Sequence, residues 1–264
     1  MPRRYKAIAA YYDPEYAGLD YLEYDVPFLL RKMPRKPVRV LEVACGTGRA
    51  AIPLAQAGHA VVGFDYDPDL LAVARRKRDA VGLSDAELTL VHADALKLNL
   101  GRRFDWAVLL FNTFLNFTTL AEQDRLLTRT ANHLEPGGKL WIDVFNPNLA
   151  MLAEEESVDL EPTAFYVPEL DRSVLRVTHV KRNSSRQTQQ VIFSYAWHDA
   201  EGDMHVEDNE FELTWMFPRE LQLVLERHGF VVEAVYGDYK GRPVTDESER
   251  IIVQASLAKP AGVV

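Results

Sequence analysis

The chain has little cysteine, no surplus of basic residues and no long apolar run. Cys45 is the single cysteine among 264 residues, which excludes an internal disulfide framework and a cysteine-rich metal cluster and favours a reducing compartment. Lys and Arg number 30 against 39 Asp and Glu, giving a net charge of -9. Proteins that track phosphates usually carry a basic surplus, so we predict no nucleic-acid partner.

No apolar stretch reaches the roughly 18 residues that a membrane-spanning helix needs. The longest apolar segment, 106–117, is interrupted by Asn112, Thr113 and Asn116. Hydrophobic residues nevertheless make up 47% of the chain and charged residues 26%, which is enough to bury a substantial core. We therefore expect a cytoplasmic protein with no membrane partner, built as one large domain or as a core with an insertion, and either monomeric or homodimeric.

Between residues 38 and 146 the sequence alternates between strand and helix patterns. Strands rich in Val, Ile and Leu that are separated by helices predict a parallel sheet covered on both faces. Asp67 is expected to cap one helix, with Pro68 as its first residue. The predicted strands are 38–44, 60–64, 88–91, 105–111 and 139–145, and the predicted helices are 50–57, 67–79 and 120–134.

The pattern changes from about residue 163, where polar and apolar residues alternate. This alternation predicts an antiparallel sheet, with a hairpin turn at 200–203. The run 154–156, three glutamates, is expected to be a solvated face or a linker. The predicted strands are 173–182, 189–199 and 205–217, followed by a helix at 218–228 and two last strands at 230–236 and 250–257.

A glycine-rich loop follows the first predicted strand and is the strongest functional signal. It reads Glu42-Val43-Ala44-Cys45-Gly46-Thr47-Gly48. Glycines let the backbone pass close to a ligand, and the next helix begins at once, so its free N–H groups face the same crevice. In doubly wound folds this crevice, at the carboxyl ends of the strands, is where ligands bind.

The loop by itself also fits a dinucleotide fingerprint. Gly46-x-Gly48-x-x-Ala51 matches that pattern, and Asp65 lies near the spacing of its ribose-binding acid. However, Glu42 would repel a pyrophosphate and attract an ammonium group, and Asp94 can accept a hydrogen bond from an exocyclic amine. A ligand with a cationic amine, a ribose and an adenine therefore fits the three acids better. A nicotinamide-dependent oxidoreductase stays the alternative, with a catalytically silent binding module as the third hypothesis.

With these motifs in order, the chain resembles the class I S-adenosylmethionine-dependent methyltransferases. Tyr11-Tyr12-Asp13 and the segment 236–253 are similar to a small-molecule subset, which includes glycine/sarcosine and aminosugar N-methyltransferases. The motifs that carry the family resemblance are Val40 to Gly48, Val62-Gly63-Phe64-Asp65-Tyr66-Asp67-Pro68, Ala93-Asp94-Ala95, Phe104-Asp105 with Phe111-Asn112, and Leu134-Glu135-Pro136-Gly137-Gly138.

The resemblance implies an α/β fold, a doubly wound seven-stranded sheet of order 3-2-1-4-5-7-6. Its last strand, 250–257, would be antiparallel. It further implies three regions: an N-terminal helical cap at 1–35, a Rossmann-like core at 36–150 and 218–264, and an antiparallel sheet inserted at 151–217 over the acceptor pocket.

The resemblance also assigns S-adenosylmethionine as cofactor. Glu42 and the carbonyl of Ala44 would hold its ammonium group, Asp65 its ribose hydroxyls, and Asp94 with the N–H of Ala95 its adenine. The residues implied to contact the cofactor are Tyr12, Glu42, Ala44, Cys45, Gly46, Thr47, Gly48, Asp65, Tyr66, Asp94, Ala95 and Phe111.

The acceptor is expected to be a small molecule, with nitrogen ahead of oxygen as the methylated atom. An amine needs only to be neutral when it attacks, and no motif assigns a dedicated base, so no catalytic residue is named. His179, His198 and His205 match no metal-ligand spacing, so no metal is predicted. The candidate acceptor residues are Tyr11, Asn112, Asn116, Asn146, His179, Trp197, Trp215 and Tyr236.

Asn146-Pro147-Asn148 resembles the signature of enzymes that methylate amines in nucleic acids. That signature follows the fourth strand of the fold, whereas here it follows the fifth. The fourth strand is followed instead by Phe111-Asn112-Thr113-Phe114, without an aromatic Pro-Pro segment. Together with the acidic charge balance, this argues against a base in nucleic acid as the acceptor.

Overall fold

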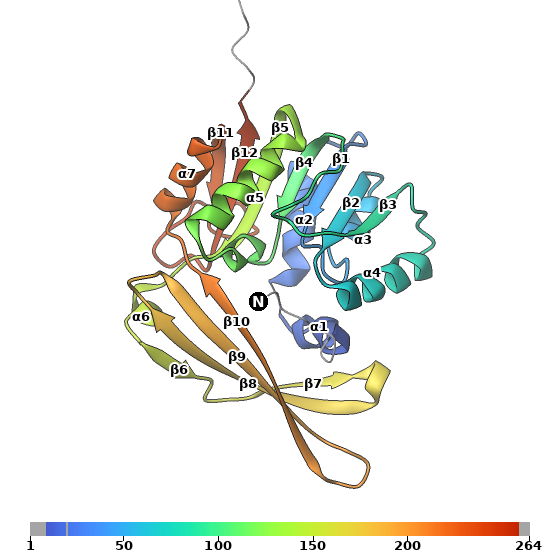
Figure 1. Cartoon of the computed structure of the whole chain (residues 1–264), viewed down its shortest axis with the longest axis vertical. Helices are drawn as coiled ribbons and strands as arrows, with labels where there is room; N and C mark the ends of the chain where they lie inside the picture. The colour runs from blue at the N-terminus through green and yellow to red at the C-terminus, as the bar shows by residue number, and fades with distance from the viewer. Residues whose placement is uncertain (1–8, 20, 259–264) are drawn as a thin grey trace, which may run out of the picture.

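Two β-sheets organise the part of the chain that the computed structural model describes, residues 9–19 and 21–258 (Figure 1). The larger sheet has seven strands in the order β11-β12-β5-β4-β1-β2-β3. Its strands are β1 (Arg39–Val43), β2 (Ala60–Asp65), β3 (Leu88–His92), β4 (Phe104–Leu109), β5 (Leu134–Phe145), β11 (Phe230–Tyr236) and β12 (Arg250–Leu257).

The strand directions confirm the predicted topology. Strands β1 to β5 pair in parallel, while β12 runs antiparallel to both β5 and β11. Because β12 occupies the seventh position and β11 the sixth, the expected order 3-2-1-4-5-7-6 is confirmed, as is the α/β class with a separate antiparallel sheet.

Helices cover both faces of the larger sheet, and each face has its own apolar core. On one face α2, α3 and α4 pack against residues such as Val40, Val61 and Trp141, and on the other α5 and α7 pack against Leu41, Ile142 and neighbours. The helices are α1 (Ala9–Tyr16), α2 (Leu22–Lys32), α3 (Ala51–Gln56), α4 (Pro68–Ala80), α5 (Leu120–Asn132), α6 (Leu149–Leu152) and α7 (Pro218–Arg227), with short 3-10 turns η1 (Thr113–Asn116) and η2 (Pro168–Leu170).

Helix α4 begins as predicted, with Asp67 as its N-cap. The side chain of Asp67 accepts hydrogen bonds from the backbone N–H groups of Asp69 and Leu70, and Pro68 is the first helical residue. Proline costs nothing at this position, because its missing N–H has no partner within the helix anyway. This cap fixes where the chain turns away from β2, and so where Asp65 lies.

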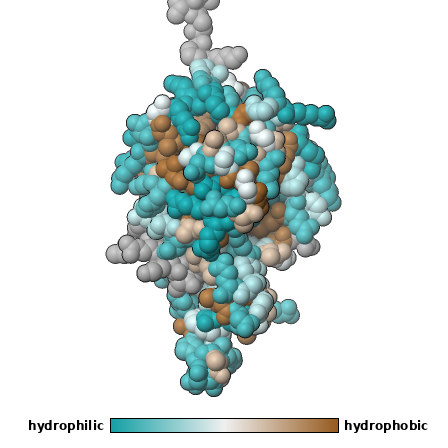
Figure 2. Space-filling model, turned by 90° about the vertical axis from the view of Figure 1, so that its right-hand side faces the viewer, coloured by the Kyte–Doolittle hydropathy of each residue, from teal (hydrophilic) through white to brown (hydrophobic). Residues whose placement is uncertain are grey.

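The inserted sheet leaves the core at the carboxyl end of β5 and returns through β10 to α7. Figure 1 shows it below the core, with α1 between the two. In Figure 2 it forms the narrow lower part of a surface that is mostly hydrophilic from this side. Its strands are β6 (Glu156–Val158), β7 (Thr163–Val167), β8 (Arg172–Asn183), β9 (Thr188–His198) and β10 (Met204–Thr214), in the order β10-β9-β8-β6 with β7 paired to β8.

Several boundaries differ from those predicted, most clearly at β5 and β6. Strand β5 begins at Leu134 rather than at residue 139, because Leu134 pairs with Phe104 before a register shift that accommodates Pro136 and the two glycines. Glu156, expected in a solvated face or linker, is the first residue of β6 and pairs with Lys181. It is still exposed, so the polar character of the run was predicted but not its strand conformation.

Within the described residues, no helix is both long enough and apolar enough to cross a membrane.

Close packing between β2 and the glycine loop generates a first prediction. A Cβ added at Gly63 would lie 2.9 Å from Sγ and 3.0 Å from Cβ of Cys45. Gly63→Ala should therefore lower the free energy of unfolding by about 1–3 kcal/mol, as overpacked cores do. Cys45→Ala removes the sulfur, so it should recover part of that loss in the double variant.

Wild type, the two single variants and the double variant form a double-mutant cycle and are compared by urea denaturation. A coupling larger than about 0.5 kcal/mol between the two substitutions is the expected result. Strictly additive effects would mean that Gly63 and Cys45 do not touch.

Candidate active site

The glycine loop turns sharply between β1 and α3. Ala44, Gly46 and Gly48 all have positive φ, at 53°, 54° and 77°. A side chain is strained in this conformation, so two of the three positions favour glycine strongly and Ala44 carries strain. A Cβ on Gly46 would meet no atom within 4 Å, so the space beside this glycine is open to a ligand.

Asp65 closes the loop from the end of β2. One carboxylate oxygen accepts the N–H of Gly46 at 2.8 Å, and the other accepts the N–H of Asp67 at 2.8 Å. Burial raises the pKa of Asp65 above its usual range, although these backbone N–H groups oppose the rise. Asp65 therefore ties two strand ends together and keeps lone pairs available for further donors.

Tyr66, Asp94 and Ala95 lie at the ends of the neighbouring strands β2 and β3. The N–H of Ala93 donates to the carbonyl of Asp65 at 2.9 Å, which holds the segment after β3 beside Asp65. Asp94 accepts the N–H of Leu96 at 2.9 Å, and Tyr66 is 45% exposed. The predicted ribose and adenine positions are thus adjacent at the edge of the sheet.

A small cavity of about 30 Å³ lies next to the glycine loop. Glu42 contributes a carboxylate that is fully buried, and its Oε2 has no hydrogen-bond partner. Buried charges are normally paired, so this oxygen marks the place where a donor is missing. The residues that line the cavity are Tyr12, Glu42, Ala44, Cys45, Arg49, Ala50, Leu110, Phe111 and Thr113.

Arg49 beside Glu42 is already committed to another acid. Its guanidinium forms two contacts with the buried Asp25 of α2, at 2.6 and 2.9 Å. Burial raises the pKa of Glu42 to about 8; Arg49 opposes the rise, while Asp25 and Asp65 add to it. Asp25 and Arg49 were not predicted from the sequence, although an acid within the apolar pattern of a helix is a usable signal.

Phe111 and Asn112 follow β4, and Phe111 forms the opposite wall of the cavity. Both residues have positive φ, at 51° and 64°. Two successive non-glycine residues in this conformation are uncommon and store strain, which functional sites often do. The ring of Phe111 packs edge-on against Tyr16, and the Arg49 guanidinium lies 5.6 Å from its centroid.

Helix α1 bridges the glycine loop and the inserted sheet. On the core side, Asp13 accepts the hydroxyl of Thr47 at 2.6 Å and the ammonium of Lys77 at 2.8 Å. On the sheet side, buried Glu15 pairs with Arg176 of β8 and accepts the Tyr195 hydroxyl at 2.9 Å. These contacts hold Tyr12 at the cavity.

The aromatic candidates for acceptor binding do not form one group. Tyr11 is buried and packs near Trp197 at the inner face of the inserted sheet, with ring centroids 6.4 Å apart. Trp197 pairs with His205 near the start of β10, whereas Trp215 follows its last residue. Ten residues of strand separate the two tryptophans by roughly 33 Å, so they do not enclose one ligand.

The other candidates already have protein partners. His179 pairs with Glu156, and its strand register places it on the face of the sheet opposite to Phe193. Asn116 donates to the carbonyls of Asn112 and Thr113, and Asn146 donates to the carbonyl of Ser248 at 2.9 Å. Tyr236 packs in the core against Phe28 and Trp141, away from the glycine loop.

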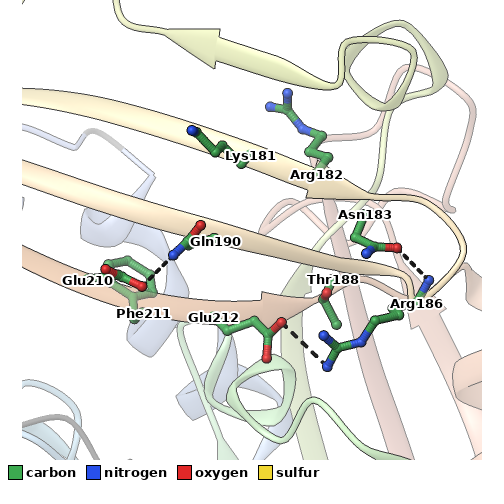
Figure 3. Close-up of a pocket in the computed structure, with 9 residues that line it drawn as sticks. All are labelled: Lys181, Arg182, Asn183, Arg186, Thr188, Gln190, Glu210, Phe211 and Glu212. Atoms are coloured by element: carbon green, nitrogen blue, oxygen red, sulfur yellow. Dashed lines mark hydrogen bonds and ion pairs between the residues drawn. The ribbon is translucent and has the colours of Figure 1, made fainter.

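A larger, open depression of about 650 Å³ lies on the inserted sheet (Figure 3). Polar pairs cross it, among them Gln190 with Glu210 and Arg186 with Glu212. It contains none of the predicted site residues. Those that line it are Lys181, Arg182, Asn183, Arg186, Thr188, Gln190, Glu210, Phe211 and Glu212.

Comparisons with known proteins agree with this geometry. Residues 40–138 match the model of a methyltransferase domain. The chain is 28% identical over 81% of its length to the cypemycin N-terminal methyltransferase of a Streptomyces species, covering 81% of that protein. It is also 28% identical over 83% of its length to the dTDP-3-amino-3,4,6-trideoxy-alpha-D-glucopyranose N,N-dimethyltransferase of Streptomyces venezuelae, covering 86% of it.

The fold comparison gives the same result. A solved S-adenosylmethionine-dependent methyltransferase from Clostridium acetobutylicum superposes with a TM-score of 0.76 at 21% identity. The match covers 96% of this chain and 99% of that one. No nicotinamide oxidoreductase supports the alternative among these matches. The sequence matches, the sheet order and the acidic glycine loop together confirm the predicted resemblance to the class I S-adenosylmethionine-dependent methyltransferases, and within them to the aminosugar N-methyltransferases.

Proposed function

We propose that the chain transfers the methyl group of S-adenosylmethionine to the neutral amine of a small molecule. The observation that carries the cofactor half of this proposal is the buried, unpartnered carboxylate oxygen of Glu42 beside an open glycine. An ammonium group would complete the hydrogen bonding of Glu42. A pyrophosphate, which the oxidoreductase hypothesis needs, offers no hydrogen to this oxygen and would be repelled by the ionised form of Glu42.

The residues around the cavity fit this cofactor. Glu42 and the Ala44 carbonyl would hold its ammonium group, Asp65 would accept its ribose hydroxyls, and Asp94 with the Ala95 N–H would contact its adenine. Bound S-adenosylmethionine supplies a methyl group that its sulfonium already activates. The task of the chain is then to orient the acceptor and exclude water, an effect that is worth up to about 7–11 kcal/mol in well-ordered reactions.

Nitrogen is favoured as the accepting atom by two features. Two relatives that match most of the chain are named as a cypemycin N-terminal methyltransferase and as an N,N-dimethyltransferase of a dTDP-linked aminosugar. In addition, the described residues that line the cavity include no histidine, and their one carboxylate, that of Glu42, is assigned to the cofactor. An amine nucleophile needs no dedicated base, which suits this arrangement better than a hydroxyl would.

The inserted sheet, with α1, is proposed to close the acceptor side. Its inner face presents Phe193, Tyr195 and Trp197 toward α1, which lies beside the cavity. The cytoplasmic location and the monomeric or dimeric state stay predictions.

Replacing Asp65 tests the cofactor site. We expect wild type to bind S-adenosylmethionine and S-adenosylhomocysteine with dissociation constants on the order of micromolar. Asp65→Asn should weaken both at least about tenfold, a loss of roughly 1.4 kcal/mol. Asp69→Asn, which changes a nearby acid in the first turn of α4, is the matched control and should bind normally.

Calorimetry with the two adenosyl ligands and with NAD(H) measures these affinities. Binding of NAD(H) without binding of the adenosyl ligands would overturn the cofactor assignment and support the oxidoreductase.

The raised pKa of Glu42 makes cofactor binding release a proton. At pH 7 a carboxyl with a pKa of about 8 is mostly protonated, and an adjacent ammonium favours its ionised form. S-adenosylhomocysteine should therefore bind more tightly as pH rises toward 8. Glu42→Gln should bind it more weakly and release less proton.

Titrations in two buffers with different ionisation enthalpies measure the proton release. An equal release from wild type and Glu42→Gln would show that another group titrates.

A matched set of acceptors tests the chemistry. Aminosugars and a short peptide with a free N-terminus are each compared with the corresponding alcohol, and methylated products are detected by mass spectrometry. We expect transfer to the amines alone, with a rate that rises as pH approaches the pKa of the amine. Methylation of the alcohols alone would contradict the assignment of nitrogen.

A further inference from the structure

A buried ion pair joins the last two strands of the core at the edge of the sheet where the cofactor site lies. Asp143 of β5 is 1% exposed and Arg250, the first residue of β12, is 6% exposed. Nε and Nη2 of Arg250 contact Oδ1 of Asp143 at 3.0 and 2.7 Å, and the Tyr239 hydroxyl donates to Oδ2 at 2.8 Å. Burying two charges is costly, so the pair needs a reason beyond stability.

The pair continues into the turn after β4. Nη2 of Arg250 also donates to Oδ1 of Asn112 at 3.2 Å, and the same oxygen accepts the N–H of Phe145 at 2.8 Å. The N–H of Asn112 donates to the carbonyl of Asp143 at 3.0 Å. Three hydrogen bonds from β5 and β12 therefore hold a single residue, Asn112, whose φ of 64° is strained.

Asn112 is adjacent to Phe111, which lines the cavity beside Glu42. The same guanidinium lies 5.5 Å from the ring centroid of Tyr21, and Tyr21 in turn lies 6.5 Å from the ring of Phe111. Arg250 thus supports Phe111 in two ways, through its backbone by way of Asn112 and through its ring by way of Tyr21.

We propose that Arg250 is a positioning residue for the cofactor site, which it shapes by holding the Phe111–Asn112 turn in its strained conformation against the glycine loop. The proposal rests on the proposed function, because the cavity must take the amino-acid end of the cofactor. Arg250 touches neither cofactor nor acceptor in this scheme. Its planar guanidinium reaches Asp143 and Asn112 together, which the single ammonium of a lysine does less well.

The antiparallel direction of β12 makes this contact feasible. Parallel strands bring their last residues to the cofactor edge, whereas β12 brings its first residue, and Arg250 pairs directly with Phe145 at the end of β5. A guanidinium at the start of an antiparallel strand therefore meets the carboxyl ends of β4 and β5.

Four variants separate positioning from general stability. Arg250→Lys keeps the charge but loses the planar guanidinium with its several N–H donors. Asn112→Ala and Asn112→Gly both remove the accepting oxygen of Asn112. Of the two, only glycine adopts a positive φ without strain. Tyr239→Phe is the control, because it removes a bond from Asp143 and leaves the contact between Arg250 and Asn112 in place.

Two ligands and one stability measurement provide the readouts. Dissociation constants are measured by calorimetry for S-adenosylhomocysteine and for 5′-methylthioadenosine, which lacks the amino-acid part, alongside the melting temperature of each variant. We expect Arg250→Lys to weaken binding of S-adenosylhomocysteine at least about tenfold and to weaken binding of 5′-methylthioadenosine less. The reason is that a displaced Phe111–Asn112 turn affects the amino-acid part of the ligand, which 5′-methylthioadenosine lacks. Tyr239→Phe should lower the melting temperature but change affinity less than about twofold.

The asparagine pair remains informative if Arg250→Lys does not fold. Asn112→Ala should bind S-adenosylhomocysteine more weakly than Asn112→Gly, because only alanine strains the turn. Equal affinities for these two variants, or affinity losses in Arg250→Lys and Tyr239→Phe that simply follow their melting temperatures, would overturn the proposal.

Hydrogen exchange of the segment 110–118 requires no ligand. Faster exchange in Arg250→Lys than in Tyr239→Phe, at matched stability, supports the positioning role, and equal exchange contradicts it. If wild type binds no adenosyl ligand, the proposed function fails, and the exchange result still decides whether Arg250 holds the turn.

Discussion

A parallel sheet ends its strands at one edge, and the cofactor site depends on this constraint. Strands β1, β2, β3 and β4 are neighbours in the sheet, so the residues that follow them are neighbours in space although they are far apart in the chain. Glu42, Asp65, Asp94 and Phe111 all lie at or just beyond these ends. A ligand can approach the backbone closely at such an edge only where side chains are small and the chain turns sharply. Positive φ angles accordingly occur together at Ala44, Gly46 and Gly48.

Electrostatic balance distinguishes the two groups of buried charge near this edge. Asp143 and Arg250 neutralise each other, and the Tyr239 hydroxyl satisfies the remaining oxygen. In contrast, Arg49 pairs with Asp25 and leaves the carboxylate of Glu42 with an unpartnered oxygen. The first group is complete without a ligand and supports the backbone, while the second is completed by a cation and so points to binding.

Helix α1 connects this edge to the inserted sheet. Asp13 contacts the glycine loop through Thr47, and two residues later Glu15 contacts β8 through Arg176. Since residues two apart point to different sides of a helix, this one short helix contacts both the core and the inserted sheet. Tyr12, between these two acids, is held at the cavity by contacts on both sides.

The sequence by itself determined which segments of the core form strands, the glycine loop and the helix cap at Asp67, because periodicity, glycine and proline act over a few neighbouring residues. The order of these strands within the sheet was implied by the family resemblance. The sequence also predicted that Glu42, Asp65 and Asp94 share one edge, since parallel topology makes this a consequence of strand ends. Asp143, within an apolar run, and Arg250, immediately before another, are charged residues that the sequence alone could not pair. The two residues lie 107 positions apart in the chain. Pairing them requires both the antiparallel direction of β12 and its register against β5.

The acceptor side shows where local pattern is insufficient. Alternation predicted the strands that carry Trp197 and His179, but which face of a twisted sheet turns toward α1 depends on contacts such as Tyr11 with Tyr195. Trp197 and Trp215 looked equivalent in sequence, but Trp197 of β9 lies beside the start of β10 and Trp215 follows its last residue. Only the tertiary structure decided these placements, because they depend on how two separately formed sheets and one helix pack together, and packing between distant segments leaves no periodic trace in the chain.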